Sequence, residues 1–157
     1  QLSEMGFKRL ILLNAHGGQI SLLNTAAREL RKVAPNLNIF PCFIWSGIKG
    51  LTHLLPQNEI DNGLHASLAE TSLMLAIKPE IVGAERPFEG FSQKVPEGWS
   101  LEGDAPTAWM TNDLSKSGVI GDSRGANEKL GHDLRDLLVK HWYKLFLSLM
   151  SSDWPNE

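Results

Sequence analysis

The sequence predicts an α/β protein built around parallel strands, and three consecutive segments carry this prediction. An apolar run from Arg9 to Leu13 has the length of a buried strand, and Gln19 to Val33 then repeats apolar residues at helical spacing. A second apolar run follows from Leu37 to Trp45. A strand, a helix and a strand in this order imply a right-handed crossover and a parallel pair of strands.

Length and composition indicate one soluble domain that spans residues 1–157. Hydrophobic residues make up 42% of the chain and charged residues 21%, and the net charge is −3. Without clustered lysines and arginines, we expect neither nucleic acid nor an anionic membrane as a partner. Cys42 is the only cysteine, so no internal disulfide forms and a cytoplasmic location is expected. No apolar run reaches the roughly 20 residues that cross a bilayer, and the first residues lack a signal-peptide pattern.

The first strand and helix have clear local signals. The strand is apolar on both faces, which is typical of a parallel strand buried in a sheet. The buried stripe of the helix comprises Leu22, Leu23, Ala26, Ala27, Leu30 and Val33. Pro35 ends the helix, and Pro41 inside the second strand favours an irregular or edge position in the sheet.

The rest of the chain alternates long loops with helices. Residues 46–62 are expected to form a long loop with a short helix, and residues 63–76 to form a helix rich in Ala and Leu. Residues 85–113 form a loop with Pro, Gly and aromatic side chains throughout, and a loop of that length is usually functional or a cover. Residues 126–150 carry the pattern of a long amphipathic helix.

His16 stands where α/β proteins hold their ligands, just beyond the end of a strand. Three interpretations are open: a hydrogen-bonded structural histidine, a metal ligand, or a neighbour of a phosphate held by N–H groups at a helix start. Gly17 and Gly18 favour a functional role, since a backbone without Cβ leaves space for an ion or a substrate. The established phosphate-binding patterns GxGxxG and GxxxxGK are absent.

His65 and Glu70 are a second candidate pair. Five residues of regular helix would separate them by about 140°, so a surface pair is the better interpretation from spacing alone. The surrounding helix is mostly apolar, however, and a buried carboxylate needs a partner such as a metal ion. Both residues can face one cleft if His65 lies at the helix start. Trp109 either walls a pocket or covers the core, and Asp122 is most simply a turn or capping residue.

Three segments together resemble the creatininase family of metal-dependent amidohydrolases. They occur in the family's order between Gly6 and Gly131, and they read GFKRLILLNAHGGQ, HASLAETSLMLAIKPEIVG and SGVIGDSRGANEKLG. The family patterns are Asn-Gly-His-Gly-Gly-Asn, His-Ala-Gly-x-x-Glu-Thr-Ser and Gly-Val-x-Gly-Asp-Pro. This sequence departs from them at Ala15, Gln19, Ser67 and Ser123.

The resemblance implies a three-layer α/β/α fold with a mainly parallel sheet. It implies hydrolysis of a C–N bond in a small cyclic or linear amide by water that a metal activates, with one or two divalent ions (Zn, Mn or Fe). It makes His16 and Glu70 metal ligands and His65 the general acid. We assign substrate contacts to Gly17, Gly18 and Trp109. Because family members are often hexamers, we also expect a homo-oligomer.

The family supplies further ligands, a Glu-x-His pair and an Asp, from a segment that precedes the strand at Lys8. This chain lacks that segment, so we expect it to be a C-terminal portion that is incomplete or inactive by itself. Two alternatives are a non-catalytic assembly or regulatory subunit with the same fold, and an α/β domain that binds a phosphate or nucleotide at Gly17 and Gly18.

Overall fold

The computed structural model describes residues 1–90 and 95–154. The chain divides into two compact units, which are described separately. Unit 1 comprises Gln1–Ile48 and Leu138–Glu157, and unit 2 comprises Lys49–Leu137. One long helix, α6 (Glu128–Met150), begins in unit 2 and ends in unit 1.

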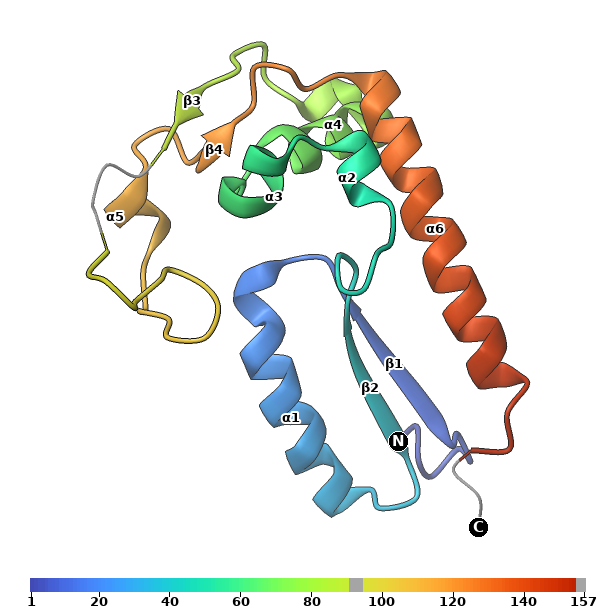
Figure 1. Cartoon of the computed structure of the whole chain (residues 1–157). Helices are drawn as coiled ribbons and strands as arrows, with labels where there is room; N and C mark the ends of the chain where they lie inside the picture. The colour runs from blue at the N-terminus through green and yellow to red at the C-terminus, as the bar shows by residue number, and fades with distance from the viewer. Residues whose placement is uncertain (91–94, 155–157) are drawn as a thin grey trace. The chain divides into compact units, whose positions relative to one another are not determined.

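Unit 1 contains the parallel strand pair that the sequence predicts. Strand β1 (Arg9–Asn14) pairs with β2 (Asn38–Phe43), and α1 (Ile20–Val33) connects them after the short 3-10 helix η1 (Gly17–Gln19). Within this unit the sheet lies between α1 and the C-terminal part of α6 (Figure 1). A layer of sheet between two layers of helix is the predicted α/β class with a parallel sheet, which is therefore confirmed.

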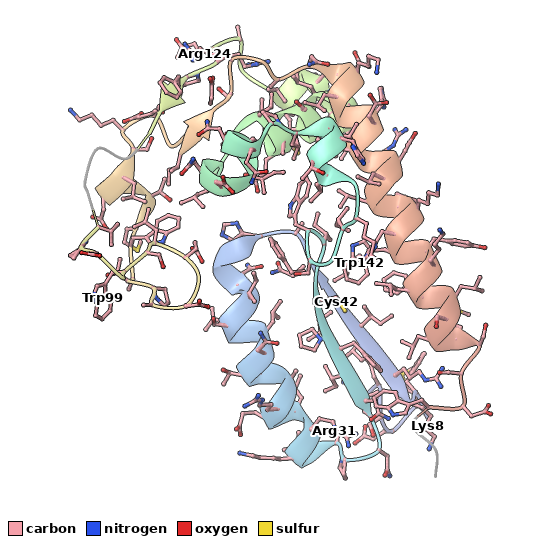
Figure 2. The ribbon with its side chains drawn as sticks, viewed as in Figure 1. Lys8, Arg31, Cys42, Trp99, Arg124 and Trp142 are labelled. Atoms are coloured by element: carbon pink, nitrogen blue, oxygen red, sulfur yellow. The ribbon has the colours of Figure 1, made fainter. Side chains whose placement is uncertain are left out.

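Long-range hydrogen bonds hold the helices of unit 1. The indole Nε1 of Trp142 in α6 donates to the carbonyl of Ile44 at 2.8 Å, just beyond β2 (Figure 2). The guanidinium of Arg9 in β1 donates to the carbonyls of Leu149, Ser152 and Trp154 at the end of α6. A cation at a helix C-terminus satisfies carbonyls that have no partner within the helix.

The second strand has the edge position that its proline indicates. Pro41 stands opposite Leu12 in the register, and among the described residues β2 pairs only with β1. Pro41 has no N–H to donate, which a strand with one open edge tolerates. The half-buried Cys42 follows it (Figure 2), and burial raises the pKa of its thiol, which disfavours a reactive thiolate.

Unit 2 is built from short elements around the start of α6. Its helices are α2 (Leu51–Leu54), α3 (Gln57–Asn62), α4 (Leu68–Ile77), the 3-10 helix η2 (Pro79–Ile81) and α5 (Thr111–Leu114). Strands β3 (Phe88–Glu89) and β4 (Gly121–Asp122) pair antiparallel. The buried centre of the unit includes Ala69, Ile120 and Leu134.

The helix predicted over residues 63–76 is wrong at its start, because α4 begins only at Leu68. His65 is instead extended and forms an antiparallel bridge with Ile120, and Ala66 has a positive φ of 48° that no helix accepts. The predicted loop 85–113 contains β3, and its residues 91–94 lie outside the described residues. No helix in the described part of the chain is long and apolar enough to cross a membrane.

Candidate active site

His16 follows β1 directly, as the sequence predicts, and a clamp formed by Asn14 holds its backbone. The Asn14 side chain accepts a hydrogen bond from the His16 N–H at 3.0 Å and donates to the His16 carbonyl at 2.6 Å. Asn14 is buried, whereas His16 is exposed. The strand end therefore presents the imidazole at the surface of unit 1 on a backbone that is fixed from both sides.

The two glycines after His16 have different surroundings. A Cβ placed on Gly18 would lie 3.0 Å from Nε2 of His16, so the missing side chain leaves room for the imidazole itself. A Cβ on Gly17 would meet nothing within 4 Å. Space at Gly18 is thus explained by His16 rather than by a substrate, and the predicted substrate contacts of both glycines stay predictions.

His65 is held by both its backbone and its ring. Its N–H and C=O bond to Ile120, at 3.2 Å and 2.8 Å. Its ring Nδ1 lies 2.7 Å from the carbonyl of Gly118, and since a carbonyl only accepts, Nδ1 carries the proton. In the neutral ring this makes Nε2 the basic nitrogen, and in the imidazolium Nε2–H becomes a donor. The proton at Nδ1 is thus fixed by the Gly118 carbonyl, and the general-acid role expected of His65 stays a prediction.

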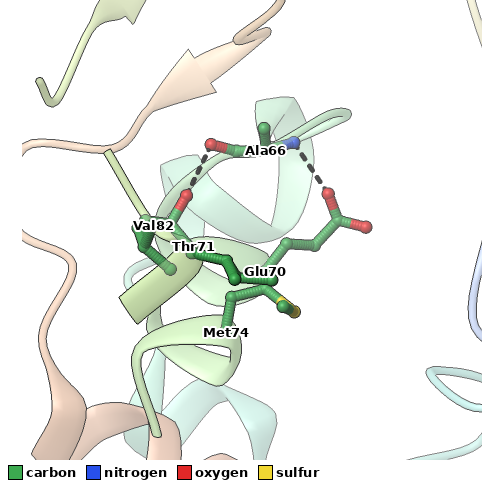
Figure 3. A pocket seen from close by; sticks show the side chains of 6 residues that line it. Ala66, Glu70, Thr71, Met74 and Val82 are labelled. Carbon is green, nitrogen blue, oxygen red and sulfur yellow. Dashed lines mark hydrogen bonds between the residues drawn. The ribbon is translucent and has the colours of Figure 1, made fainter. Parts of the chain in front are cut away.

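Glu70 and Thr71 both bind the backbone of Ala66, as Figure 3 shows. The Ala66 N–H donates to Oε2 of Glu70 at 2.7 Å, and the hydroxyl of Thr71 donates to the Ala66 carbonyl at 2.8 Å. These bonds hold Ala66 at its positive φ. Oε1 of Glu70 accepts no hydrogen bond from the described residues, which leaves a carboxylate oxygen for a ligand.

The positions of His65 and Glu70 resolve the question of helical spacing. His65 lies before α4 begins, and only Glu70 is in the helix, in its first turn. The separation of about 140° that a regular helix would impose therefore does not apply. His65 thus lies outside the helix rather than at its start, and its service of one site together with Glu70 stays a prediction.

A shallow cavity of about 230 Å³ adjoins the Glu70 carboxylate in unit 2 (Figure 3). It is lined by Ala66, Glu70, Thr71, Met74, Ile81 and Val82. Apart from the carboxylate and the Thr71 hydroxyl, these side chains are apolar. The cavity thus combines one anionic group with an apolar wall.

Trp109 belongs to a loop that closes on itself. Its indole Nε1 donates to the carbonyl of Leu101 at 3.2 Å, and the side chain is half-buried. Trp99 in the same loop is exposed (Figure 2). The indole N–H is thus used within the loop, and the substrate contact assigned to Trp109 stays a prediction.

Asp122 is the last residue of β4, and its carboxylate accepts the N–H of Arg124 in the turn that follows, which is the turn role among the two predicted for it. Its carboxylate accepts hydrogen bonds from the backbone and guanidinium of Arg124, which lower the pKa of Asp122 to about 2. The Arg124 guanidinium also lies over the ring of Phe88, 4.5 Å from its centroid (Figure 2). These contacts tie β4 to β3 and give Asp122 a structural role.

The donors of the predicted metal site fit a divalent ion in kind but not in number. An imidazole from His16 and a carboxylate from Glu70 suit zinc, manganese or iron. A catalytic site generally has three protein ligands, and in residues 1–90 and 95–154 no group of three His, Cys, Asp or Glu side chains could hold an ion. The two residues also lie in different units. Each residue therefore offers one donor of a suitable kind within its own unit, and the predicted metal ligation by His16 and Glu70 stays a prediction.

Reasoning from the sequence alone did not identify two residues that shape this region. Asn14 has a recognisable signal, since an Asn two residues before a turn commonly clamps the backbone ahead of it. Glu59 in α3 is buried and bonds to Ser67 and Ala69 at the start of α4. Glu59 has no local signal, because its partners lie eight and ten residues further along the chain.

Comparison with known proteins identifies the relatives of this chain. A family model described as "Creatininase: Creatinine amidohydrolase" matches residues 1–146. No curated protein matches the chain. A solved structure of a candidate creatinine amidohydrolase from Bacteroides fragilis NCTC 9343 is 22% identical, with a TM-score of 0.78 over 98% of this chain and 58% of its own.

Two further solved structures are a mutant creatininase of the Zn-Zn type and a structure described as "Creatininase Mn". They are 21% and 20% identical, with TM-scores of 0.68 and 0.69. Each match covers 96% of this chain and 60% of the other, so this chain spans about three fifths of the length of these relatives. The structures establish the fold, which is creatininase-like. The match of the family model over nearly the whole sequence establishes more than the fold: the chain belongs to the creatininase family.

Proposed function

We propose that this protein is a metal-dependent hydrolase that cleaves the C–N bond of a small cyclic or linear amide with a metal-activated water. The observation that carries the proposal is the way His65 and Glu70 are held. Hydrogen bonds to Gly118 and Ala66 fix the tautomer of the imidazole and the direction of the carboxylate. Membership of the creatininase family supports the same reaction class.

The proposed roles follow from these two groups. Glu70 would supply a carboxylate ligand to a divalent ion, and His16 would supply an imidazole ligand. When bound, such an ion lowers the pKa of a coordinated water and polarises the amide carbonyl. His65 holds a proton at Nε2 and delivers it to the leaving nitrogen, while the Gly118 carbonyl stabilises the imidazolium through Nδ1–H. Two similar structures, one of a Zn-Zn type creatininase and one of a creatininase with Mn, support zinc or manganese as the ion.

The remaining parts of the proposal concern partners and location. The substrate is proposed to be a small amide, the sequence-based substrate contacts of Gly17, Gly18 and Trp109 are kept as proposals, and the protein is proposed to form a homo-oligomer. The family resemblance supports a hexamer. The single cysteine supports a reducing, cytoplasmic environment.

Metal binding by the full-length protein tests this function. We expect isothermal titration with Mn²⁺ to show tight binding that His16→Ala and Glu70→Ala each weaken by more than about 100-fold, because each removes a direct ligand and loss of a residue that only orients a ligand already costs roughly 10- to 100-fold. His53→Ala and Glu80→Ala, which change exposed residues of the same types, are the matched controls and should bind as the unmodified protein does. If the protein binds no Mn²⁺ or Zn²⁺, or the two ligand variants retain binding, the proposal is wrong.

His65→Gln separates catalysis from metal binding. It should keep the Mn²⁺ affinity and lower hydrolysis of creatinine or a related cyclic amide about 10²- to 10⁴-fold, the usual contribution of a general acid. A variant with unchanged turnover would remove His65 from the mechanism.

A second candidate is a non-catalytic assembly or regulatory subunit with the same fold. The observation in its favour is that the described residues contain no group of three metal ligands. It predicts that the full-length protein shows no hydrolysis with any added metal. It also predicts that a chelator does not weaken binding to the protein with which this subunit assembles.

A further inference from the structure

Glu59 is a buried charged residue to which the proposed function gives no role. It lies in α3 in unit 2, and only 7% of its surface is exposed. A carboxylate at such a depth is costly unless hydrogen bonds compensate it. Its partners therefore indicate what it does.

Both carboxylate oxygens of Glu59 bind the start of α4. Oε1 accepts the Ala69 N–H at 2.9 Å, and Oε2 accepts the hydroxyl of Ser67 at 2.5 Å. The Ser67 hydroxyl in turn accepts the N–H of Asp122 at 3.0 Å. Through Ser67, which is 2% exposed, one carboxylate joins α3, α4 and β4.

Two glycines make room for this cluster. A Cβ on Gly63 would lie 2.6 Å from Oε2 of Glu59, and a Cβ on Gly121 would overlap the Ser67 hydroxyl. Gly121 also has a φ of +135°, which L-residues rarely adopt. The backbone on both sides is thus shaped around the pair of Glu59 and Ser67.

The pair replaces the ordinary cap of α4. Ser67 is the N-cap residue, but its side chain makes no capping bond to the helix. The carboxylate of Glu59 caps the helix instead at Ala69, and a negative charge at a helix N-terminus is favourable. Glu70 is the next residue, and its carboxylate bonds to Ala66, the neighbour of His65. The cap therefore lies at the base of the segment that carries both proposed site residues.

We propose that Glu59, acting through Ser67, is a positioning residue that sets the orientation of the Glu70 carboxylate and of His65. This inference rests on the proposed function for its consequence in metal binding. An uncharged amide at this position cannot replace the carboxylate. A Gln amide has only one acceptor oxygen, so in Glu59→Gln its NH2 group would face either the Ser67 hydroxyl or the Ala69 N–H, and that donor would lose its acceptor.

Glu59→Gln and Ser67→Ala in the full-length protein test the inference, with Ser72→Ala as the matched control. Ser72 is also a buried serine of α4, and its hydroxyl accepts a backbone N–H, that of Asn127. We expect Glu59→Gln to weaken Mn²⁺ binding about 10- to 100-fold, as for other residues that orient a ligand. Ser67→Ala should weaken it in the same direction, whereas Ser72→Ala should lower the melting temperature without changing the Mn²⁺ affinity.

A second readout needs no metal. The amide hydrogen of Ala66 is protected by Glu70, so its exchange rate, measured by NMR, reports the position of that carboxylate. Glu59→Gln should speed exchange at Ala66 and Ala69, and Ser72→Ala should not. If Glu59→Gln lowers stability but leaves Ala66 exchange unchanged, the inference is overturned and Glu59 is only a structural cap. Absence of Mn²⁺ binding in the unmodified protein would overturn the proposed function, while Ala66 exchange would still decide the positioning role.

Discussion

Two side chains hold the backbone of Ala66 in a strained conformation. A non-glycine residue in the left-handed region costs on the order of 1–2 kcal/mol. Here the N–H and C=O of Ala66 are both bonded, by Glu70 and Thr71, so the strain is held by two side chains of α4. Strained backbone persists where its surroundings determine it fully, and such positions concentrate at functional sites.

The Glu89 carboxylate makes a testable contribution to stability. It accepts hydrogen bonds from the hydroxyl and N–H of Ser117 and from the N–H of Lys116, which lower its pKa from 4.5 to about 2. A lowered pKa in the folded state stabilises the protein above pH 4.5, and this stabilisation is lost as the pH falls towards 2.

We therefore expect Glu89→Gln to lower the melting temperature at pH 7 and to converge with the unmodified protein as the pH approaches about 2. Thermal unfolding followed by circular dichroism across this pH range measures both curves. For Glu80→Gln, at an exposed position, the melting temperature should differ from that of the unmodified protein by the same amount at every pH. A Glu89→Gln difference that is constant with pH would show that ionisation of Glu89 contributes nothing.

At this scale the sequence predicts the residues whose chemistry is local. His16 at a strand end was identifiable because a strand and a helix flank it. Glu59 was not, because a turn through Gly63 brings its carboxylate to partners in another helix. The roles of Gly17, Gly18 and Trp109 remain predictions from the sequence.

The start of α4 depends on contacts from outside the helix. Most of its residues are helix formers from position 64 onward, yet pairing between His65 and Ile120 delays the helix to Leu68. The local sequence pattern does not indicate a bridge to so distant a residue, and the start of the helix was therefore predicted wrongly. By contrast, β1, α1, β2 and α6 are governed by their own apolar periodicity and lie close to where the sequence predicts them.

Close packing of α4 and α6 in unit 2 requires Gly131. A Cβ there would overlap the carbonyl of Ser72, which is backbone and cannot rotate away. We expect Gly131→Ala to lower the free energy of unfolding by about 1–3 kcal/mol, the usual cost of overpacking. Urea denaturation measures the change. Gly83→Ala, where a Cβ meets nothing within 4 Å, is the control and should be nearly neutral. Equal stability of the two variants would contradict this account of the helix contact.

The sheet of unit 1 carries information about assembly. Parallel sheets are normally buried on both faces, but among the residues of β1 and β2 only Asn14 is buried. Helix α1 also exposes large apolar side chains, with Leu22 at 70% and Val33 at 81%. Apolar surface of this kind commonly lies against further protein, and the proposed homo-oligomer is one way to cover it.

We expect light scattering of the full-length protein to give a mass that is a multiple of the chain mass at micromolar concentration. Leu22→Glu combined with Val33→Lys should reduce that mass if α1 lies in the interface between copies. Glu85→Lys, on the exposed surface of unit 2, is the control and should leave the mass unchanged. A monomer at all concentrations would contradict the oligomer.

The division into two units has a consequence for synthesis on the ribosome. Unit 2 is continuous in sequence, but unit 1 is interrupted by the whole of it. The bond between Trp142 and Ile44 joins residues 98 positions apart. At about 5–20 residues per second, β1, α1 and β2 wait roughly 5–20 s for the helix that covers them. During that time the whole of unit 2 is synthesised, so it can fold before the strands that precede it are covered.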